Sequence, residues 1–422
     1  MMPCQFKAAR PWICSGLLLL CPLTSLMAGE VKFQAMAELR LALTDDDTGW
    51  TDAGLGKARY GGEANDRQTV AEISDLSLLI LPEWNETLSG VAHLHYQPEQ
   101  ANPLDVISAL VRYRQQTESD WRFSSRLGLF FPPISLEHKG PAWQSPYSLT
   151  PSAINSWVGE ELRTLGGELS LHYTGTTQSA TLTHALFIAN DPTGTILAWR
   201  GWALHDIKTG FYDDLPLPPI PAITPGGTFF PKQATQVEPF HEVDQHPGFY
   251  SAATWQSAAL KMRYLHYDNW ADQERLNHGR GQYAWHTRFN SASVQWQMTS
   301  QWEWLSQYLE GTSAMGRSTD GQGLVDIRFR SVYLLLSRAW GQHRLSARYD
   351  WFQVDDRDHT TDDNNQEQGN SWMAAYTFAL KEQQHLLLEY LWIDSTRAAR
   401  ETLGLAPDSQ ESLIQLGYRL AF

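Results

Sequence analysis

The feature that most constrains this chain is an alternation of apolar and polar residues that recurs in one segment after another. In the last segment, ESLIQLGYRLAF, every even-numbered residue from 414 to 422 is apolar or aromatic, whereas Gln415, Gly417 and Arg419 are polar or small. A period of two places successive side chains on opposite faces of a β-strand. The sequence therefore predicts strands that have one apolar face and one polar face.

Similar segments extend along the chain from residue 31. The clearest are 31–43, 121–131, 283–290, 294–303 and 344–351. Weaker ones lie at 73–82, 88–98, 105–115, 162–173, 179–189, 248–257, 259–268, 324–339, 371–380, 385–394 and 411–422. Together they predict 16 strands.

The connections between these segments are of two kinds. Short turns are expected near 86–89, 118–120, 175–177, 290–293 and 381–384, and long polar connections at 44–70, 132–160, 190–247, 269–280, 309–323, 355–370 and 395–410. Short turns at one rim and long loops at the other are typical of an antiparallel transmembrane β-barrel with extracellular loops and periplasmic turns. A soluble β-sandwich or propeller is the alternative, but the sequence shows no internal repeat of the kind that a propeller needs.

The first 28 residues are predicted to be a signal peptide. Lys7 and Arg10 precede the apolar run WICSGLLLLCPL, and SLMAGE then offers a cleavage site after Ala28. The run is shorter than the roughly 20 apolar residues of a spanning helix. Residues 29–422 are predicted to form the barrel. All three cysteines (Cys4, Cys14 and Cys21) lie in the leader, so the barrel is predicted to contain no disulfide.

The charge balance argues against nucleic acid as a partner. The chain has 32 lysines and arginines against 47 aspartates and glutamates, which gives a formal net charge of −15. Its mean hydropathy is only −0.39, while 12% of its residues are aromatic. A barrel accommodates both values, because only alternate residues have to face lipid.

If the apolar face of each strand meets lipid, the polar face lines the lumen. Ten arginines are predicted there: Arg40, Arg112, Arg114, Arg122, Arg126, Arg263, Arg288, Arg328, Arg330 and Arg348. Guanidinium groups bind carboxylates and phosphates through paired hydrogen bonds, and a basic pore attracts anions. The alternative is that acids such as Asp326 and Asp350 pair with these arginines and only brace the wall.

The C-terminal strand ending in Phe422 resembles the terminal strand of bacterial outer-membrane proteins, which the barrel-assembly machinery reads. The strand count and loop pattern resemble the bacterial porin superfamily, and GLFFPPISLEH weakly resembles the phosphate-selective porin O and P group. The resemblance implies a constriction loop at 132–160, an environment of outer-membrane lipid and lipopolysaccharide, and a homotrimer. The expected constriction-loop residues are Glu137, His138, Lys139, Trp143, Tyr147 and Trp157.

These observations predict an outer-membrane porin for passive diffusion of small polar solutes, with a moderate preference for anions. One alternative is a sugar- or aromatic-specific porin that uses Trp143, Trp157, Trp199 and Trp202 as a stacking surface. Another is a structural or adhesive barrel that is plugged by the long connection 190–247.

The sequence has no G-x-S-x-G elbow and no H-E-x-x-H motif, so neither an enzyme nor a cofactor is expected. His93 and His95 alone are too few for a metal site.

Overall fold

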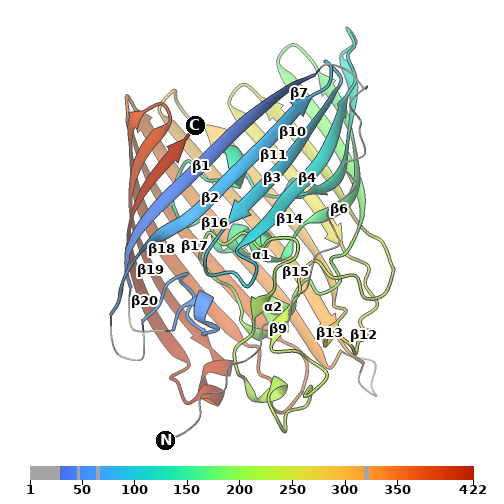
Figure 1. Cartoon of the computed structure of the whole chain (residues 1–422), viewed down its shortest axis with the longest axis vertical. Helices are drawn as coiled ribbons and strands as arrows, with labels where there is room; N and C mark the ends of the chain where they lie inside the picture. The colour runs from blue at the N-terminus through green and yellow to red at the C-terminus, as the bar shows by residue number, and fades with distance from the viewer. Residues whose placement is uncertain (1–28, 45–47, 63–66, 318–322) are drawn as a thin grey trace, which may run out of the picture.

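The computed structural model describes residues 29–44, 48–62, 67–317 and 323–422, and the predicted signal peptide lies outside them. Sixteen antiparallel strands form one closed barrel (Figure 1), as predicted. The strands are β1 (Glu30–Leu43), β2 (Thr69–Glu83), β3 (Leu88–Tyr96), β4 (Leu104–Arg114), β5 (Trp121–Phe130), β6 (Thr164–Thr174), β7 (Gln178–Ile188), β10 (Gly248–Ser257), β11 (Leu260–Asp268), β14 (His286–Gln297), β15 (Trp302–Met315), β16 (Val325–Trp340), β17 (His343–Asp356), β18 (Glu367–Lys381), β19 (Gln384–Arg397) and β20 (Asp408–Ala421).

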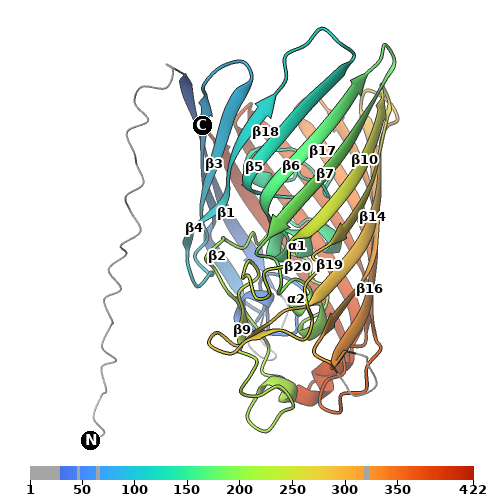
Figure 2. The ribbon, with the colours of Figure 1, turned by 90° about the vertical axis from the view of Figure 1, so that its right-hand side faces the viewer.

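Pairing between the first and last strands closes the barrel. Met36 to Leu43 of β1 pair with Ala421 to Ile414 of β20, and Phe422 exchanges two backbone hydrogen bonds with Ala35, of 2.7 and 2.9 Å. A closed barrel leaves no strand edge without a partner, as a hydrocarbon environment requires. The C-terminus lies at the same end as the start of β1 (Figure 2). We call this end, which carries the short turns, the turn end, and the opposite end the loop end.

The outward-facing side chains form an apolar surface around the barrel. Phe33 on β1 is 64% exposed, Leu127 on β5 is 68% exposed and Leu182 on β7 is 61% exposed. Soluble proteins rarely leave so large an apolar surface in contact with water. The surface is of the kind that lipid covers in transmembrane barrels.

Among the described residues, no helix is long and apolar enough to cross a membrane.

The strand boundaries differ from the prediction in one region. Residues 290–293 were expected to form a turn because Asn and Ser favour turns, but they lie inside β14 and pair with β15. The chain turns after Gln297 instead, and β15 continues to Met315, into the connection expected at 309–323. Ser291 faces the barrel interior and accepts a hydrogen bond of 2.9 Å from Gln307, which explains why small polar residues suit this strand.

Three connections at the loop end fold back into the barrel. We call residues 48–62, 131–163 and 189–213 the plug. It contains two short helices, α1 (Ala153–Glu161) and α2 (Thr195–Trp199), and every residue of both is buried. Figure 1 shows both helices within the outline of the barrel. Ser152 caps α1, because its side chain accepts a hydrogen bond from the backbone N–H of Asn155.

Short elements complete the connections at the loop end. They are the strand pairs β8 (Leu215–Pro216) with β9 (Gln236–Val237) and β12 (Leu276–Asn277) with β13 (Gln282–Tyr283), and the 3-10 turns η1 (Trp50–Asp52), η2 (Pro141–Trp143), η3 (Pro221–Ile223) and η4 (Ala398–Leu403).

Candidate functional site

A hollow lies at the turn end of the barrel interior, and five of the ten predicted lumen arginines line it. The hollow has a volume of about 670 Å³. We call the six lysines and arginines that line this hollow the basic vestibule. Its members are Arg112 and Arg114 on β4, Arg122 and Arg126 on β5, and Lys261 and Arg263 on β11. Alternation along these strands turns all six cations to the inside, as the sequence pattern predicts.

The charge of the vestibule is positive. Its lining includes six lysines and arginines but only three carboxylates, Glu83, Glu86 and Glu168. Glu168 is already bound, because Arg126 contacts it at 2.8 and 2.5 Å and the Tyr250 hydroxyl donates to it at 2.6 Å. The remaining cations therefore outnumber the remaining acids, and the low-dielectric wall of the barrel strengthens their field.

Two further predicted arginines face inward but are bound to the plug. Arg40 on β1 donates to Gln415 at 2.9 Å and pairs with Asp206 at 2.7 Å. Arg348 on β17 pairs with Asp350 at 2.7 Å and with Glu137 of the plug at 3.4 Å. Both side chains are buried, so they join the plug to the wall instead of lining open water.

The prediction for Arg288, Arg328 and Arg330 is wrong, because these residues lie on the outer face of the barrel. Their strand neighbours Phe289 and Phe329 point inward and are buried against the plug. The apolar face of β14 and β16 thus meets a protein core at the loop end, and the charged face points outward. Arg328 pairs there with Glu310 at 3.2 Å, and Arg330 pairs with Asp355 at 2.8 Å.

The predicted constriction loop lies inside the barrel. Lys139 pairs with Glu303 on β15 at 2.7 Å, and the Tyr147 hydroxyl donates to the same carboxylate at 2.6 Å. His138 stacks on Trp143 with ring centroids 3.5 Å apart. Burial holds the pKa of His138 well below its usual value, so its ring is neutral at pH 7.

The remaining members of that loop lie deeper. Glu137 accepts from Ser152 at 2.5 Å, and Trp157 packs against Phe289 and Phe329 with centroid distances of 5.4 and 5.3 Å. These contacts fix α1 against the wall.

The tryptophans that suggested a stacking surface for sugars are buried. Trp157, Trp199 and Trp202 are 2%, 0% and 0% exposed. The Trp143 ring lies between Phe131 and His138, at centroid distances of 4.0 and 3.5 Å. A sugar ring needs a free aromatic face, and none of these four tryptophans presents one in this structure.

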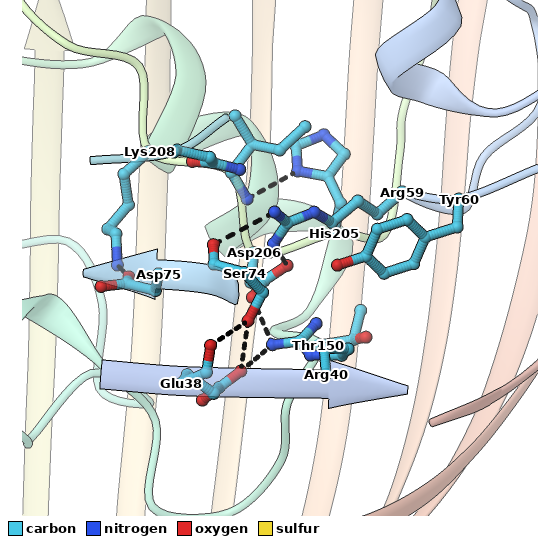
Figure 3. A network of polar contacts seen from close by, with 12 residues as sticks. Glu38, Arg40, Arg59, Tyr60, Ser74, Asp75, Thr150, His205, Asp206 and Lys208 are labelled. Atoms are coloured by element: carbon cyan, nitrogen blue, oxygen red, sulfur yellow. Dashed lines mark hydrogen bonds and ion pairs between the residues drawn. The ribbon is translucent and has the colours of Figure 1, made fainter. Parts of the chain in front are cut away.

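The sequence did not indicate a second ionic cluster, which joins the plug to β1 and β2 (Figure 3). Asp206 accepts from Arg40 at 2.7 Å and from Arg59 at 2.8 Å, and Lys208 forms an ion pair with Asp75. Burial disfavours the charged form of Asp206, but the two guanidinium groups hold its pKa well below its usual range. We call Glu38, Arg40, Arg59, Asp75, Asp206 and Lys208 the charged seam. Three of its members come from connections without periodicity, where sequence spacing gives no information about contacts.

Among the described residues, one group of three carboxylates is close enough to hold a cation. Oxygens of Asp191, Glu242 and Asp244 lie within 4.8 Å of one another at the loop end. Asp191 already accepts from the backbone N–H of Val243 at 2.5 Å, and Glu242 accepts from that of Ala189 at 2.8 Å. The fold of the loop itself therefore accounts for this cluster.

The closed barrel of sixteen strands is similar in fold to solved bacterial outer-membrane channels and porins. The outer-membrane channel DcaP of Acinetobacter baumannii superposes with a TM-score of 0.53 at 9% identity, covering 93% of this chain and 97% of that chain. The anion-selective porin of Comamonas acidovorans gives 0.51 at 12% identity, covering 93% and 100%.

A loop-deletion mutant of OmpT, an outer membrane protein of Vibrio cholerae, gives a TM-score of 0.52 at 9% identity and covers 94% and 100%. No protein-family model matches the sequence, and neither does any curated protein. At these identities the similarity is one of fold.

Proposed function

We propose that this chain is an outer-membrane channel of the porin type that lets small polar solutes diffuse across the membrane and prefers anions. The observation that carries the proposal is the basic vestibule, where six cations face a hollow with three carboxylates. Anions entering this hollow meet guanidinium groups that can bind a carboxylate or phosphate through two hydrogen bonds. No chemical step is required.

The outer surface supports the membrane location. Exposed apolar side chains surround the barrel, and the turn end would face the periplasm. Phe422 lies at that rim with 65% of its surface exposed, where the assembly machinery could read it during insertion. Export by a signal peptide at 1–28 belongs to the same proposal.

Phosphate as a dedicated solute receives less support. The connection 132–160 contains one lysine, Lys139, and its ammonium group is paired with Glu303. A phosphate trap in this loop would need several free cations. The proposed preference is therefore for small anions as a class, and it comes from β4, β5 and β11.

A second function, a closed structural or adhesive barrel, is favoured by the packing of the plug. Every residue of α1 and α2 is buried, and the apolar core is continuous from the plug to the inner faces of β14 to β19. A continuous apolar core of this kind excludes water from the space between the plug and these strands. The two functions differ in whether the plug leaves a path beside it.

Recording of the refolded mature protein in planar bilayers under a KCl gradient tests the proposal. We expect stepwise conductance with a reversal potential that favours chloride. A reversal potential that favours potassium would overturn the anion preference. No conductance from protein that is folded and heat-modifiable would overturn the channel and favour the closed barrel.

A further inference from the structure

The plug contacts the barrel wall through apolar groups and through ion pairs, and the ion pairs lie on β15 and β17 as well as on β1 and β2. Toward β14 and β16 the contact is apolar, as in the packing of Trp157 on Phe289 and Phe329. Toward β1 and β2 it is the charged seam, in which Asp206 and Lys208 meet wall residues through ion pairs. Apolar contacts exclude water, whereas ionic contacts can be hydrated and can exchange partners.

The charged seam reaches the solvent at the loop end. Arg59 contacts Glu72 at 3.4 Å, Glu99 at 2.9 Å and Asp206 at 2.8 Å. The side chains of these three acids are 18%, 19% and 20% exposed. Arg59 itself is buried, so water touches one side of this ionic group and the barrel interior lies on the other.

One branch of the seam continues to a hollow at the turn end. Arg40 pairs with Glu38, and Glu38 pairs with Arg419 of β20 at 2.7 Å. Arg419 lines a hollow of about 450 Å³ together with Arg344 and His385. Charged groups thus follow one another from the loop end to an open space at the turn end.

A second branch leads toward the basic vestibule. Lys208 pairs with Asp75, whose carboxylate accepts from Ser77 at 2.7 Å. Ser77 lies 3.0 Å from the ring of His93, and His93 lines a hollow that Arg112 and Arg126 also line. Both of these arginines belong to the vestibule. The second branch therefore connects the seam to the site that selects for anions.

Buried polar atoms without a hydrogen-bond partner among the described residues occur beside the seam. They include Nε of Arg40, Nε of Arg59, Nδ1 of His95, Nε2 of Gln97 and Oε1 of Gln100. Buried polar atoms in folded proteins are almost always satisfied, by protein or by ordered water. Ordered water would satisfy these atoms beside the seam, as it would the unpartnered Tyr333 hydroxyl on β16.

We propose that the charged seam is the hydrated path by which small ions pass the plug and reach the vestibule. This inference rests on the proposed channel function. The arginines and acids of the seam exchange partners with a passing ion, while the apolar contact on the opposite side holds the plug in place. The residues that line the path are those of the seam together with Ser74 and Ser77.

The chain allows a direct test because residues 29–422 contain no cysteine. We would introduce one thiol at a time by Ser77→Cys or Ser74→Cys beside the seam, and by Ser331→Cys at the apolar contact. All three serines face inward and are buried, with exposures of 3%, 1% and 0%. Any difference in labelling rate therefore cannot come from a difference in burial in the folded structure. Two seam variants are used so that a folding defect in one of them does not prevent the test.

The readouts are the rate of labelling by a cationic methanethiosulfonate in proteoliposomes and the single-channel current after labelling. We expect the seam thiols to react at least about tenfold faster than the thiol at 331, as hydration of one contact and not the other requires. We also expect labelling at the seam to reduce the current. Equal or slower labelling at the seam would overturn the inference.

The two proposals fail in different ways. Rapid labelling at the seam without any conductance in unlabelled protein would overturn the channel function. It would still support the inference that the seam is hydrated. Conductance that persists unchanged after complete labelling at the seam would place the path elsewhere and leave the channel function standing.

Discussion

Arg348 on β17 forms an ion pair of 3.4 Å with Glu137 in the plug, and neither side chain is exposed to solvent. The same guanidinium group pairs with Asp350 at 2.7 Å and donates to the backbone carbonyls of Thr150 at 2.7 Å and Pro151 at 2.9 Å. One wall residue thus neutralises two buried carboxylates and holds the chain just before α1.

Arg348→Ala is expected to destabilise the plug. Removing one partner of a buried ion pair costs about 3–5 kcal/mol, because the other charge remains buried. Burial already raises the pKa of Glu137 against the opposing effect of Arg348, so the pKa should rise further without this cation. We expect a lower unfolding midpoint in guanidinium chloride and a larger single-channel conductance.

Arg338→Ala is the matched control, because Arg338 is exposed on β16, where it lies over the rings of Trp302 and Trp340 and donates to Gln301 at 3.5 Å. Its effect should stay within roughly 0.5 kcal/mol, as for most surface substitutions. Equal effects of the two variants would show that Arg348 does not hold the plug.

Gly201→Ala is expected to disturb the plug more than Gly226→Ala. Both glycines have a positive φ, of 82° and 98°, so alanine adds backbone strain of about 1 kcal/mol at either position. At 201 the new Cβ would also collide with the carboxylate of Glu367, which pairs with Arg397, whereas at 226 it would meet open space.

The clash should add roughly 1–3 kcal/mol, as overpacking does in protein cores. Limited proteolysis of the connection 189–247 in detergent provides the measurement, and Gly201→Ala should be cleaved faster. Identical cleavage of the two variants would contradict the observed packing of Gly201 on Glu367.

Asp191 should make the connection 189–247 less stable at alkaline pH. Burial, together with the neighbouring Glu242 and Asp244, raises the pKa of this carboxyl to about 7. An ordinary aspartate titrates near 4. Between about pH 4 and 7 the folded loop therefore binds more protons than the unfolded loop, so its stability falls as the pH rises through this window.

Asp191→Asn keeps a carbonyl oxygen for the backbone N–H groups of Val243 and Asp244 and removes the charge. At pH 8 the variant should be more resistant to proteolysis in this loop by on the order of 2 kcal/mol, and at pH 4 the two proteins should match. A variant that is less resistant at pH 8 would show that the charge stabilises the loop.

Much of the barrel could be predicted because lipid imposes a period of two on the strands. On β1 the exposed Phe33 and Leu39 alternate with the buried Glu38 and Arg40, as the sequence indicated. The vestibule arginines on β4 and β5 followed from the same alternation. The strand count depended on composition and turns, and it was confirmed although one turn was misplaced.

The same rule failed where the barrel interior is filled with protein. Phe289 and Phe329 are apolar because they pack on Trp157 of the plug, and the adjacent Arg288 and Arg328 therefore point outward. Alternation shows that two faces differ, but it does not show which face meets lipid. The charged seam could not be predicted either, because Arg59 and Asp206 come from irregular connections that only the fold brings together.

The most direct test of the account reverses charge in the vestibule and on the outer face of the same barrel. Arg112→Glu with Arg122→Glu changes two cations that line the hollow, while Arg328→Glu changes one that points away from it. The measurement is the reversal potential of single channels under a KCl gradient. The account predicts a shift toward cation selectivity in the vestibule variant and no shift in the outer-face variant. An unchanged reversal potential in a conducting vestibule variant, or an equal shift in both, would contradict the claim that the vestibule sets the preference for anions.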